Sequence, residues 1–586
     1  MRIDPTVGGF PALDLMRFDA RMGEKVRRKI AGIAVIALAA GILHGSSAAA
    51  EAADVHVIPI DPVLTEDPDA LLDLYRAGTV RAQLADPTAS ARCGAAAPGP
   101  VPDGEDIVVK LSPAAPFTVG KINPTTWRRP PVADPTWRMG YEGLMWMRPL
   151  ARRAAMDGQT KSLDALVDQV VSFHAKNPDP KSNSYGWDEG TALRRLETEN
   201  CLYALTGSEK LRKPIFNDVN VLLGFRYYGP PYAPVHNHGL MANLQIIRAG
   251  DHLHRADWTK RASDRLVAEA PLAFSKRGVI WEQASQYQVV NADLWDQAAR
   301  TLAESPGTGA AVTSIRRSVA NARTAFTWMT EPDGKIVQIG DSEKIDGEAA
   351  NPSRAPRTFR DDQTGWIIGR WSWTDPKTSY YTIRYGPSRR AHGHHDRAGG
   401  VTYTAKGVRV LVGPGKYNYD RKNNFYAYQI SAQSHNVPIP AKGKAGNGAS
   451  TVSGSVAQAA AHAWTIKNTV YGTGRAHSRN VNVNRDASRM TVTDKFPKAQ
   501  LWRQYWHLDP QWRRVSGVKN GKTLVFAHPS GRKLRITTTG AVSGFVKGIT
   551  RPPAGWHYPS FGNRVQAYEI VIRSTAPTLT TTFTVS

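Results

Sequence analysis

The stretch SLDALVDQVVSF, residues 162–173, repeats its apolar side chains at helical spacing. Leu163, Leu166, Val167, Val170 and Val171 fall on one face of a helix, because residues three and four apart are neighbours there. Comparable periodicity recurs at 141–155, 190–205, 239–254, 259–273, 287–303 and 309–328. Short breaks rich in Gly, Pro and Asn separate these segments. Such a row of amphipathic helices predicts stacked helical hairpins between about residues 135 and 330.

From about residue 360 the pattern changes to that of strands. The stretch GVTYTAKGVRVLVG, residues 400–413, holds two short runs rich in Val, Thr and Tyr on either side of a Lys-Gly turn. Similar runs stand at 364–373, 379–386, 488–496, 522–528, 532–540, 566–574 and 578–586. β-Branched and aromatic residues bounded by turn residues are typical of strands. Helices followed by strands predict two domains, the first all-α and the second a β-sandwich.

The N-terminus has the three parts of a secretory leader. A basic KVRRK at 25–29 precedes the apolar run 30–43, and small residues follow up to a cleavage site near Ala50 or Ala52. This pattern predicts a signal peptide over 1–52, with Met22 as the true start, and an uncleaved anchor is the alternative. Since no later segment is apolar enough to span a bilayer, we expect a secreted or periplasmic protein without stable membrane insertion.

The chain is strongly basic, with a formal net charge of +25. Residues 1–50 carry seven Lys and Arg and four Asp and Glu, so their removal leaves +22. A surface of this charge attracts polyanions, and outside the cell these are nucleic acid, anionic cell wall or acidic polysaccharide. Charge alone does not choose among them, and it is also compatible with a role in solubility only. The two cysteines, Cys93 and Cys201, exclude a Cys-rich zinc site, and export would permit them to pair.

Histidines are concentrated in AHGHHDRAGG, residues 391–400, which holds His392, His394, His395 and Asp396. The first two alternate in an extended register and therefore point to the same side. A metal site, a proton-transfer site and an inert exposed loop are the three interpretations of this cluster.

Two further stretches carry groups suited to chemistry. VHNHGLM (235–241) places Asn237 and His238 at the start of a predicted helix, where helix capping is the plainer interpretation. GVIWEQASQYQVVNADLW (278–295) places Glu282 before the next helix and Tyr287 inside it. A tyrosine in this position is more often a core or rim residue.

Taken in order, six short motifs resemble those of the heparinase II/III-like polysaccharide lyases, including alginate-lyase-like relatives. They are NHG (237–239), EQASQY (282–287), IGDSE (339–343), HGHHD (392–396), LVGPGKYNYD (411–420) and SHN (434–436). The likeness covers about residues 130–450. It implies an (α/α) toroid over 126–345, after an extension at 53–125, and a C-terminal antiparallel β-sandwich over 355–586.

The resemblance implies β-elimination on a uronic-acid-containing polysaccharide, a reaction that requires no cofactor. Asn237 and His238 match the residues that neutralise the substrate carboxylate. Tyr287 matches the tyrosine that transfers the proton, and His392 is expected to assist or to face the carboxylate. The expected partner is an anionic polysaccharide rather than nucleic acid, and the polymer, endo or exo cleavage and oligomeric state stay open.

Glu282, Tyr417 and Tyr419 are secondary catalytic candidates. One alternative function is a toroid glycoside hydrolase, with its carboxylate pair drawn from Asp188, Glu189 or Glu282. A second alternative is a secreted protein that binds acidic glycans without cutting them.

The resemblance also implies a structural zinc ion held by His394, His435 and an aspartate. This chain has Gly413 at the aspartate position, which puts the metal in question. Asp396 is the candidate replacement, since two histidines and a carboxylate suit Zn²⁺. His395 is expected to have no chemical role.

Overall fold

The computed structural model describes residues 93–99, 101, 108–109, 117–118, 127 and most of 135–586. The gaps in the last range are 225–235, 306, 349–356, 442–445, 447, 487 and 498. The predicted signal peptide, the Met22 start and most of the 53–125 extension lie outside the described residues.

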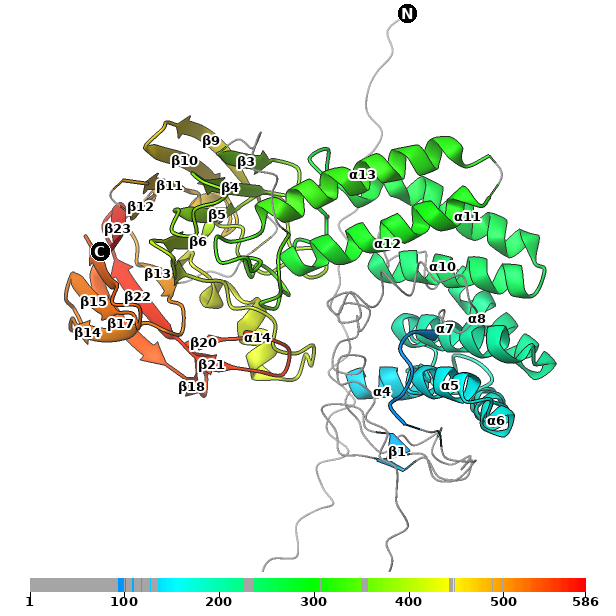
Figure 1. Cartoon of the computed structure of the whole chain (residues 1–586). Helices are drawn as coiled ribbons and strands as arrows, with labels where there is room; N and C mark the ends of the chain where they lie inside the picture. The colour runs from blue at the N-terminus through cyan, green and yellow to red at the C-terminus, as the bar shows by residue number, and fades with distance from the viewer. Residues whose placement is uncertain are drawn as a thin grey trace, which may run out of the picture. The chain divides into compact units, whose positions relative to one another are not determined.

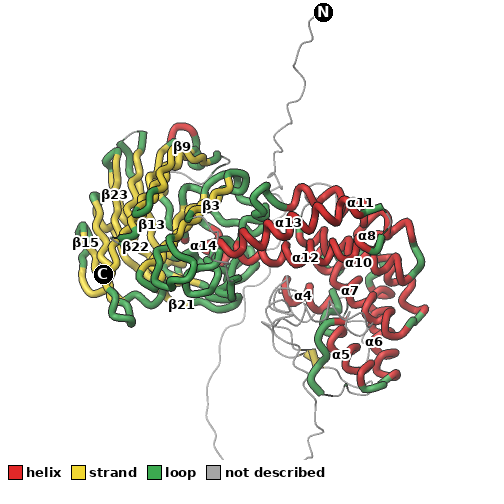
Figure 2. The backbone as a smooth tube through the Cα atoms, turned by 45° about the horizontal axis from the view of Figure 1, so that its top comes forward, coloured by secondary structure: helices red, strands yellow, loops and turns green. Residues whose placement is uncertain are grey.

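The helices occupy the first half of the described chain (Figure 1). They are α4 (Pro135–Glu142), α5 (Met147–Met156), α6 (Thr160–Lys176), α7 (Glu189–Thr206), α8 (Arg212–Leu223), α10 (Asn237–His252), α11 (Ala256–Ala273), α12 (Ser285–Ala303) and α13 (Gly309–Trp328). Consecutive helices pack in pairs, with α10 against α11 and α12 against α13, and α10 also contacts α7 and α12 (Figure 2). The predicted stacking of helical hairpins is therefore confirmed.

The face predicted for α6 is the one that packs inward. Leu163, Leu166, Val167 and Val170 are buried, whereas Val171 is only half-buried. They belong to one apolar cluster that runs through all of these helices and includes Trp137, which is fully buried. Burying this stripe supplies the main free energy for a helix of ordinary propensity.

Two features of the helical half differ from the prediction. The segment 141–155 is two helices, because the chain turns at Leu144, whose φ is 54°. The restart at Met147 leaves Pro149 in the first turn of α5, where a missing N–H costs nothing. Helix α8 was not predicted, because its apolar face is interrupted by the buried Asp218.

Besides two short pairs, β18 (Ile549–Thr550) with β19 (Pro553–Ala554) and β20 (Trp556–His557) with β21 (Val565–Gln566), the second half of the described chain has three larger antiparallel sheets. The first has the order β3 (Thr358–Asp361), β4 (Trp366–Arg370), β5 (Tyr380–Arg384), β6 (Gly400–Ala405) and β7 (Val408–Leu411). The largest has the order β14 (Arg513–Ser516), β15 (Thr523–Ala527), β16 (Lys533–Thr538), β23 (Thr578–Val585), β12 (Arg489–Lys495), β11 (His477–Asn484), β10 (Ala461–Asn468) and β9 (Ser450–Ala457). The third has the order β17 (Ala541–Lys547), β22 (Tyr568–Ser574), β13 (Trp502–His507) and β8 (Pro438–Pro440).

One continuous apolar cluster lies between these sheets, as expected for a β-sandwich, and it includes Trp464, Trp502, Trp506 and Phe583. The expected antiparallel sandwich is confirmed, and every predicted strand run forms a strand. Among the strands that were not predicted, β11 carries polar residues at most of its positions. Its fully buried Arg479 forms a bidentate ion pair with Asp494, at 2.8 Å for both contacts.

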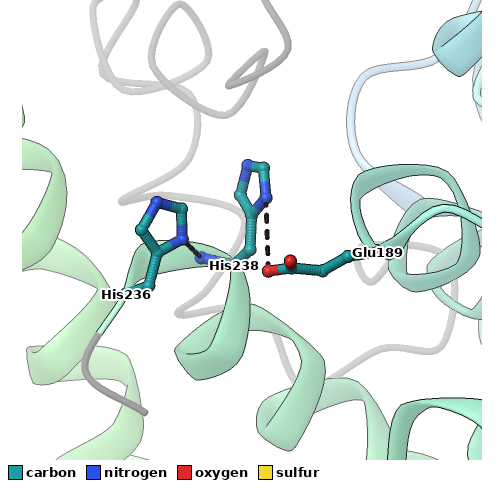
Figure 3. Close-up of side chains that lie close together, drawn as sticks. All are labelled: Glu189, His236 and His238. Atoms are coloured by element: carbon teal, nitrogen blue, oxygen red, sulfur yellow. Dashed lines mark hydrogen bonds and ion pairs between the residues drawn. The ribbon is translucent and has the colours of Figure 1, made fainter. Parts of the chain in front are cut away.

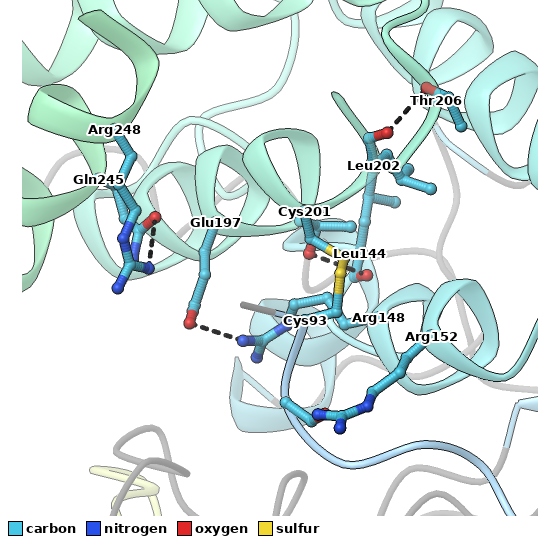
Figure 4. Close-up of a disulfide and its surroundings, with 12 residues drawn as sticks. Cys93, Leu144, Arg148, Arg152, Glu197, Cys201, Leu202, Thr206, Gln245 and Arg248 are labelled. Atoms are coloured by element: carbon cyan, nitrogen blue, oxygen red, sulfur yellow. Dashed lines mark hydrogen bonds and ion pairs between the residues drawn. A yellow bond between two sulfur atoms is a disulfide. The ribbon is translucent and has the colours of Figure 1, made fainter. Parts of the chain in front are cut away.

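The two cysteines form a disulfide between Cys93 and Cys201 (Figure 4). It ties the segment 93–101 to α7, and Ala97 of that segment also accepts a hydrogen bond from Arg153 at 2.8 Å. The two cysteines are 108 residues apart in the sequence, and a cross-link that closes so long a loop restricts the unfolded chain strongly. The pairing that the sequence left open is therefore settled by the fold.

Helices and strands meet at a third apolar cluster, which joins the end of α13 to the first sheet through Trp328, Phe359 and Trp366. Next to it, the backbone N–H of Ser285 at the start of α12 donates to Ile339 at 3.0 Å. These contacts fix the start of α12 against the segment 336–343. Among the described residues, no helix has the length and hydropathy needed to span a bilayer.

Candidate active site

The first part of the site is the N-terminus of α10. His236 caps this helix, because its Nδ1 accepts a hydrogen bond from the backbone N–H of His238 at 3.2 Å. The side-chain oxygen of Asn237 accepts from the same N–H at 2.8 Å, so the amide nitrogen lies at the opposite end of that side chain. The backbone N–H of Asn237 donates to Glu282 at 3.1 Å. His236 is the N-cap residue, and it shares the N–H of His238 with Asn237, which accepts it at the shorter distance.

The second part is a stack of two rings. Tyr287, in the first turn of α12, lies face to face with His392, with centroids 3.5 Å apart and planes 9° from parallel. The Tyr287 hydroxyl is 3.0 Å from the hydroxyl of Tyr419. His392 also has its Nε2 3.6 Å from the Glu282 carboxylate and its ring 6.2 Å from that of His236. Glu282, Tyr287 and His392, which come from two separate stretches of sequence, therefore lie in one group with Tyr419 and His236.

Asp341 holds this group in place, and the sequence analysis did not single it out. Its carboxylate accepts from His392 Nδ1 at 3.2 Å, from His394 Nε2 at 2.8 Å and from Gln429 at 2.8 Å. Burial by itself would raise the pKa of Asp341, but the hydrogen bonds and charges of His392 and His394 outweigh it and lower that pKa. The only signal in the sequence was its place in IGDSE, which was read as a family motif without a role.

The backbone next to Asp341 leaves no room for a side chain. Gly340 has φ +64°, and a Cβ there would lie 2.7 Å from the carbonyl oxygens of both Gln283 and His392. This close approach lets the backbone N–H of Asp341 donate to the His392 carbonyl at 2.8 Å. The glycine of IGDSE is therefore required by the packing of three chain segments.

Of the three secondary catalytic candidates, Tyr419 and Glu282 contact the ring stack and Tyr417 packs elsewhere. Tyr419 contacts Tyr287, whereas the Tyr417 ring stacks on Tyr558 at 5.0 Å and packs against Phe425 at 5.7 Å. Glu282 joins the start of α10 to His392, as described above, and is buried.

Asp188 and Glu189, the carboxylates considered for a hydrolase, have different roles at the start of α7. Asp188 caps α7 by accepting from Gly190 at 3.3 Å, and Glu189 lies 3.6 Å from His238 Nδ1.

His394 and His435 are connected to the ring stack through Asp341, which accepts from both His392 and His394. Nδ1 of His394 is 3.2 Å from Nε2 of His435. The other nitrogen of each ring donates outward, from His394 to Asp341 at 2.8 Å and from His435 to the Ser431 carbonyl at 2.7 Å. In neutral rings, two lone pairs would therefore face each other, and a metal cation between them would stabilise the pair. The separation suits two ligands of a tetrahedral zinc ion, which are roughly 3.4 Å apart for bonds of about 2.1 Å.

The third zinc ligand expected from the family does not fit this chain. A Cβ on Gly413 would lie 2.1 Å from the Gln338 carbonyl oxygen, so the backbone here excludes an aspartate. Asp396 instead lies 3.4 Å from Nε of the buried Arg384. Among the described residues, neither Asp396 nor another carboxylate completes a three-ligand group with His394 and His435. Only His394 and His435 match the ligand set expected for zinc, and the third ligand is missing among the described residues.

We expect the change His394→Ala to lower the melting temperature, by the equivalent of roughly 1–3 kcal/mol. It removes one of the three side-chain donors to the buried Asp341 and leaves Nε2 of the buried His435 without its His394 partner, and an unpaired buried polar group costs about this much. Calorimetry of the variant, together with elemental analysis of protein purified without chelator, checks this expectation. An unchanged melting temperature and no stoichiometric metal would show that the two histidines have no structural role.

We expect Asp341→Asn to reduce turnover by roughly tenfold to a hundredfold, the usual loss when a partner that orients a functional histidine is removed. The amide keeps the shape but presents an N–H₂ group to one of the two rings. A matched change is Asp361→Asn, in a buried carboxylate of β3 that accepts from Thr364. It should leave turnover close to that of the parent, because its hydrogen-bond partner is Thr364 of its own segment and not a ring of the candidate site. Equal rates in Asp341→Asn and the parent would contradict the positioning role.

No family model matches the sequence, and no curated protein matches it. Solved structures do match. A mutant of the heparan sulfate lyase HepC from Pedobacter heparinus superposes with a TM-score of 0.62 at 16% identity, covering 88% of each chain. A heparinase III structure superposes with a TM-score of 0.66 at 14% identity, covering 88% of this chain and 89% of that one. The chain therefore has the heparinase II/III-like fold, a helical toroid followed by an antiparallel β-sandwich.

Proposed function

We propose that this protein is a polysaccharide lyase that cleaves a uronic-acid-containing polymer by β-elimination. The observation that carries the proposal is the tyrosine pair, Tyr287 and Tyr419, whose hydroxyls are 3.0 Å apart and whose first ring stacks on His392. The start of α10, with Asn237 and His238, joins the same group through Glu282. A proton-transfer pair next to donors for a carboxylate is what this reaction needs.

In the reaction, a base removes the proton from C5 of the uronate, and the electron pair left there forms the C4–C5 double bond. The bond between C4 and the glycosidic oxygen breaks, and that oxygen takes a proton as it leaves. The C5 proton is hardly acidic while the neighbouring carboxylate is charged, because the anion formed would carry two negative charges. Donors directed at the carboxylate reduce this cost, as in an oxyanion hole.

Asn237 and His238 are the donors in this proposal. Both lie in the first turn of α10, where the helix dipole also favours a negative charge. Asn237 is fully buried, with its oxygen held by the N–H of His238, and this fixes the orientation of its amide. A fixed donor does not need to reorganise as charge develops, which makes it effective in the transition state.

The two tyrosines would handle the protons. Their hydroxyls share a hydrogen bond, so a proton can pass between them and one can act as base while the other acts as acid. Lys416, fully buried in β-domain packing, has its ammonium 5.6 Å from the Tyr419 ring centroid and 3.3 Å from Glu343. This ammonium is already paired with the Glu343 carboxylate, so the tyrosine pair and not Lys416 carries the proton transfer in this proposal.

One assay panel tests the proposal and separates it from its rivals. Purified protein is incubated with heparan sulfate, hyaluronan, alginate and a neutral polysaccharide. A lyase produces an unsaturated sugar that absorbs in the near ultraviolet, a hydrolase produces only new reducing ends, and a binder produces neither. Reducing ends without ultraviolet absorbance would replace the lyase proposal with a hydrolase.

We also propose that the protein is exported, on the basis of the leader pattern at 22–52. Sequencing the N-terminus of the mature protein tests this, and a mature form that retains residues 25–43 would contradict it.

We expect the rate at low substrate concentration to fall steeply with added salt. A chain with a formal charge of +22 after loss of residues 1–50 should capture a polyanion by long-range attraction. The screening length is about 8 Å at physiological salt and about 3 Å at 1 M, so this attraction disappears over that range. The measurement is kcat/KM against ionic strength, with kcat as the internal control. A flat kcat/KM would mean that charge has no part in substrate capture.

A further inference from the structure

A second cluster of possible metal ligands borders the candidate active site. Glu189, His236 and His238 each offer one ligand atom, and these atoms lie within 4.8 Å of one another (Figure 3). Glu189 is the first residue of α7, and the two histidines flank the start of α10. The rings of His236 and His238 are 4.9 Å apart and nearly perpendicular, and Glu189 Oε1 is 3.6 Å from His238 Nδ1.

Two imidazoles and one carboxylate are a ligand set typical of zinc with an open coordination position. Ligand atoms of a tetrahedral ion with bonds of about 2.1 Å lie roughly 3.4 Å apart. Side-chain rotations that move the three ligand atoms by roughly an ångström would therefore bring them to that spacing. The side chains of His238 and Glu189 are 19% and 12% exposed, so an ion can reach them from solvent. All three lie within two helix termini, which makes the positions of their backbones well defined.

We propose that Glu189, His236 and His238 bind a zinc-type divalent cation reversibly, and that the bound ion inhibits the enzyme. The binding follows from the ligand geometry. The inhibition rests on the proposed function, because His238 is one of the two groups assigned to the substrate carboxylate. A metal ion on its ring would occupy the lone pair and hold the ring toward α7, away from Asn237.

The other cluster of possible ligands in the described chain, His174, Glu199 and Asp218, does not compete as an accessible site. All three are buried in the helical core, and Arg195 is hydrogen bonded to Asp218 at 2.9 Å. A cation there would meet the Arg195 guanidinium. The pair His394 and His435 is also buried and is separated from the proposed site by the ring stack.

Binding is tested first, without any substrate. Metal-free full-length protein is titrated with Zn²⁺ in a calorimeter and with Co²⁺ in a spectrophotometer, since tetrahedral Co²⁺ absorbs strongly in the visible range. We expect the variants His236→Ala and Glu189→Gln to weaken Zn²⁺ binding by more than about tenfold, the lower end of the loss when even an outer partner of a metal site is removed. The variant His254→Ala, in an exposed histidine after α10, is the matched control and should bind as the parent does.

Inhibition is tested next, in each variant relative to its own metal-free rate. We expect Zn²⁺ to inhibit the parent and His254→Ala at the same concentration, and His236→Ala to need more than about ten times as much, in step with its weaker binding. Binding that is unchanged in His236→Ala would overturn the site. Binding that weakens in the variants while Zn²⁺ leaves the parent rate unchanged would overturn the inhibition. If no polymer is cleaved at all, the proposed function fails, and the binding titration still decides the site.

Discussion

Tyr287→Phe is expected to lower turnover by on the order of a hundredfold or more, the usual contribution of a positioned acid or base. The change removes one hydroxyl and leaves the ring, so the stack on His392 and the packing of α12 should persist. Because the hydroxyl acts on the proton only as the bond to C5 breaks, the loss should appear in kcat more than in KM. The measurement is steady-state ultraviolet absorbance on the polymer that the assay panel identifies.

Two further variants make this result specific. Tyr417→Phe is the matched control, because its ring packs on Tyr558 and Phe425, whereas the hydroxyl bonded to Tyr287 belongs to Tyr419. We expect this variant to retain the parent rate. Tyr419→Phe removes the other hydroxyl of the pair. If the two hydroxyls act as one unit, the double variant should be little slower than either single variant. Cleavage by Tyr287→Phe at the parent rate would transfer the role to Tyr419.

Asn237→Ala is expected to cost a similar factor, about a hundredfold in kcat, which is the scale for one lost oxyanion-type donor. The amide is buried and oriented by the N–H of His238, so its removal leaves the substrate carboxylate with less compensation as charge develops. His236 still caps α10 in this variant, and the fold should therefore survive. Circular dichroism and the melting temperature provide that control.

The isosteric change Asn237→Asp tests the reason for the loss. It preserves size and the oxygen that accepts from His238, but it puts an anion where the substrate carboxylate must bind. If neutralisation is the role of Asn237, this variant should be at least as slow as Asn237→Ala and should improve as the pH is lowered. Parent-like activity in Asn237→Asp would contradict the assignment.

The periodicity of the sequence was enough to determine the two halves of the fold and their order. Apolar spacing of three and four residues buries one face of a helix, as in α6, and this constraint acts within a single segment. The predicted strand runs form strands because their signal, β-branched and aromatic residues bounded by turn residues, also lies within a single segment. The pattern failed where buried positions carry charged side chains, as at Asp218 in α8 and Arg479 in β11. There an oppositely charged partner on another segment compensates the buried charge, and the spacing within one segment does not reveal that partner.

The site was predictable only in part. The motifs identified Asn237, His238, Tyr287 and His392, and the structure brings all four into one connected group. Their catalytic roles stay predictions until the variants are measured.

The sequence by itself determined the fold class and which stretches carry chemistry, because helical and strand periods and short motifs are local properties of the chain. The tertiary structure alone decided three other points. It placed Asp341 on two histidines that lie 51 and 53 residues away, it chose Tyr419 over Tyr417 as the partner of Tyr287 across 132 residues, and it brought the Gln338 carbonyl against Gly413. Each depends on contacts between segments far apart in the chain, and no spacing within one segment encodes such a contact.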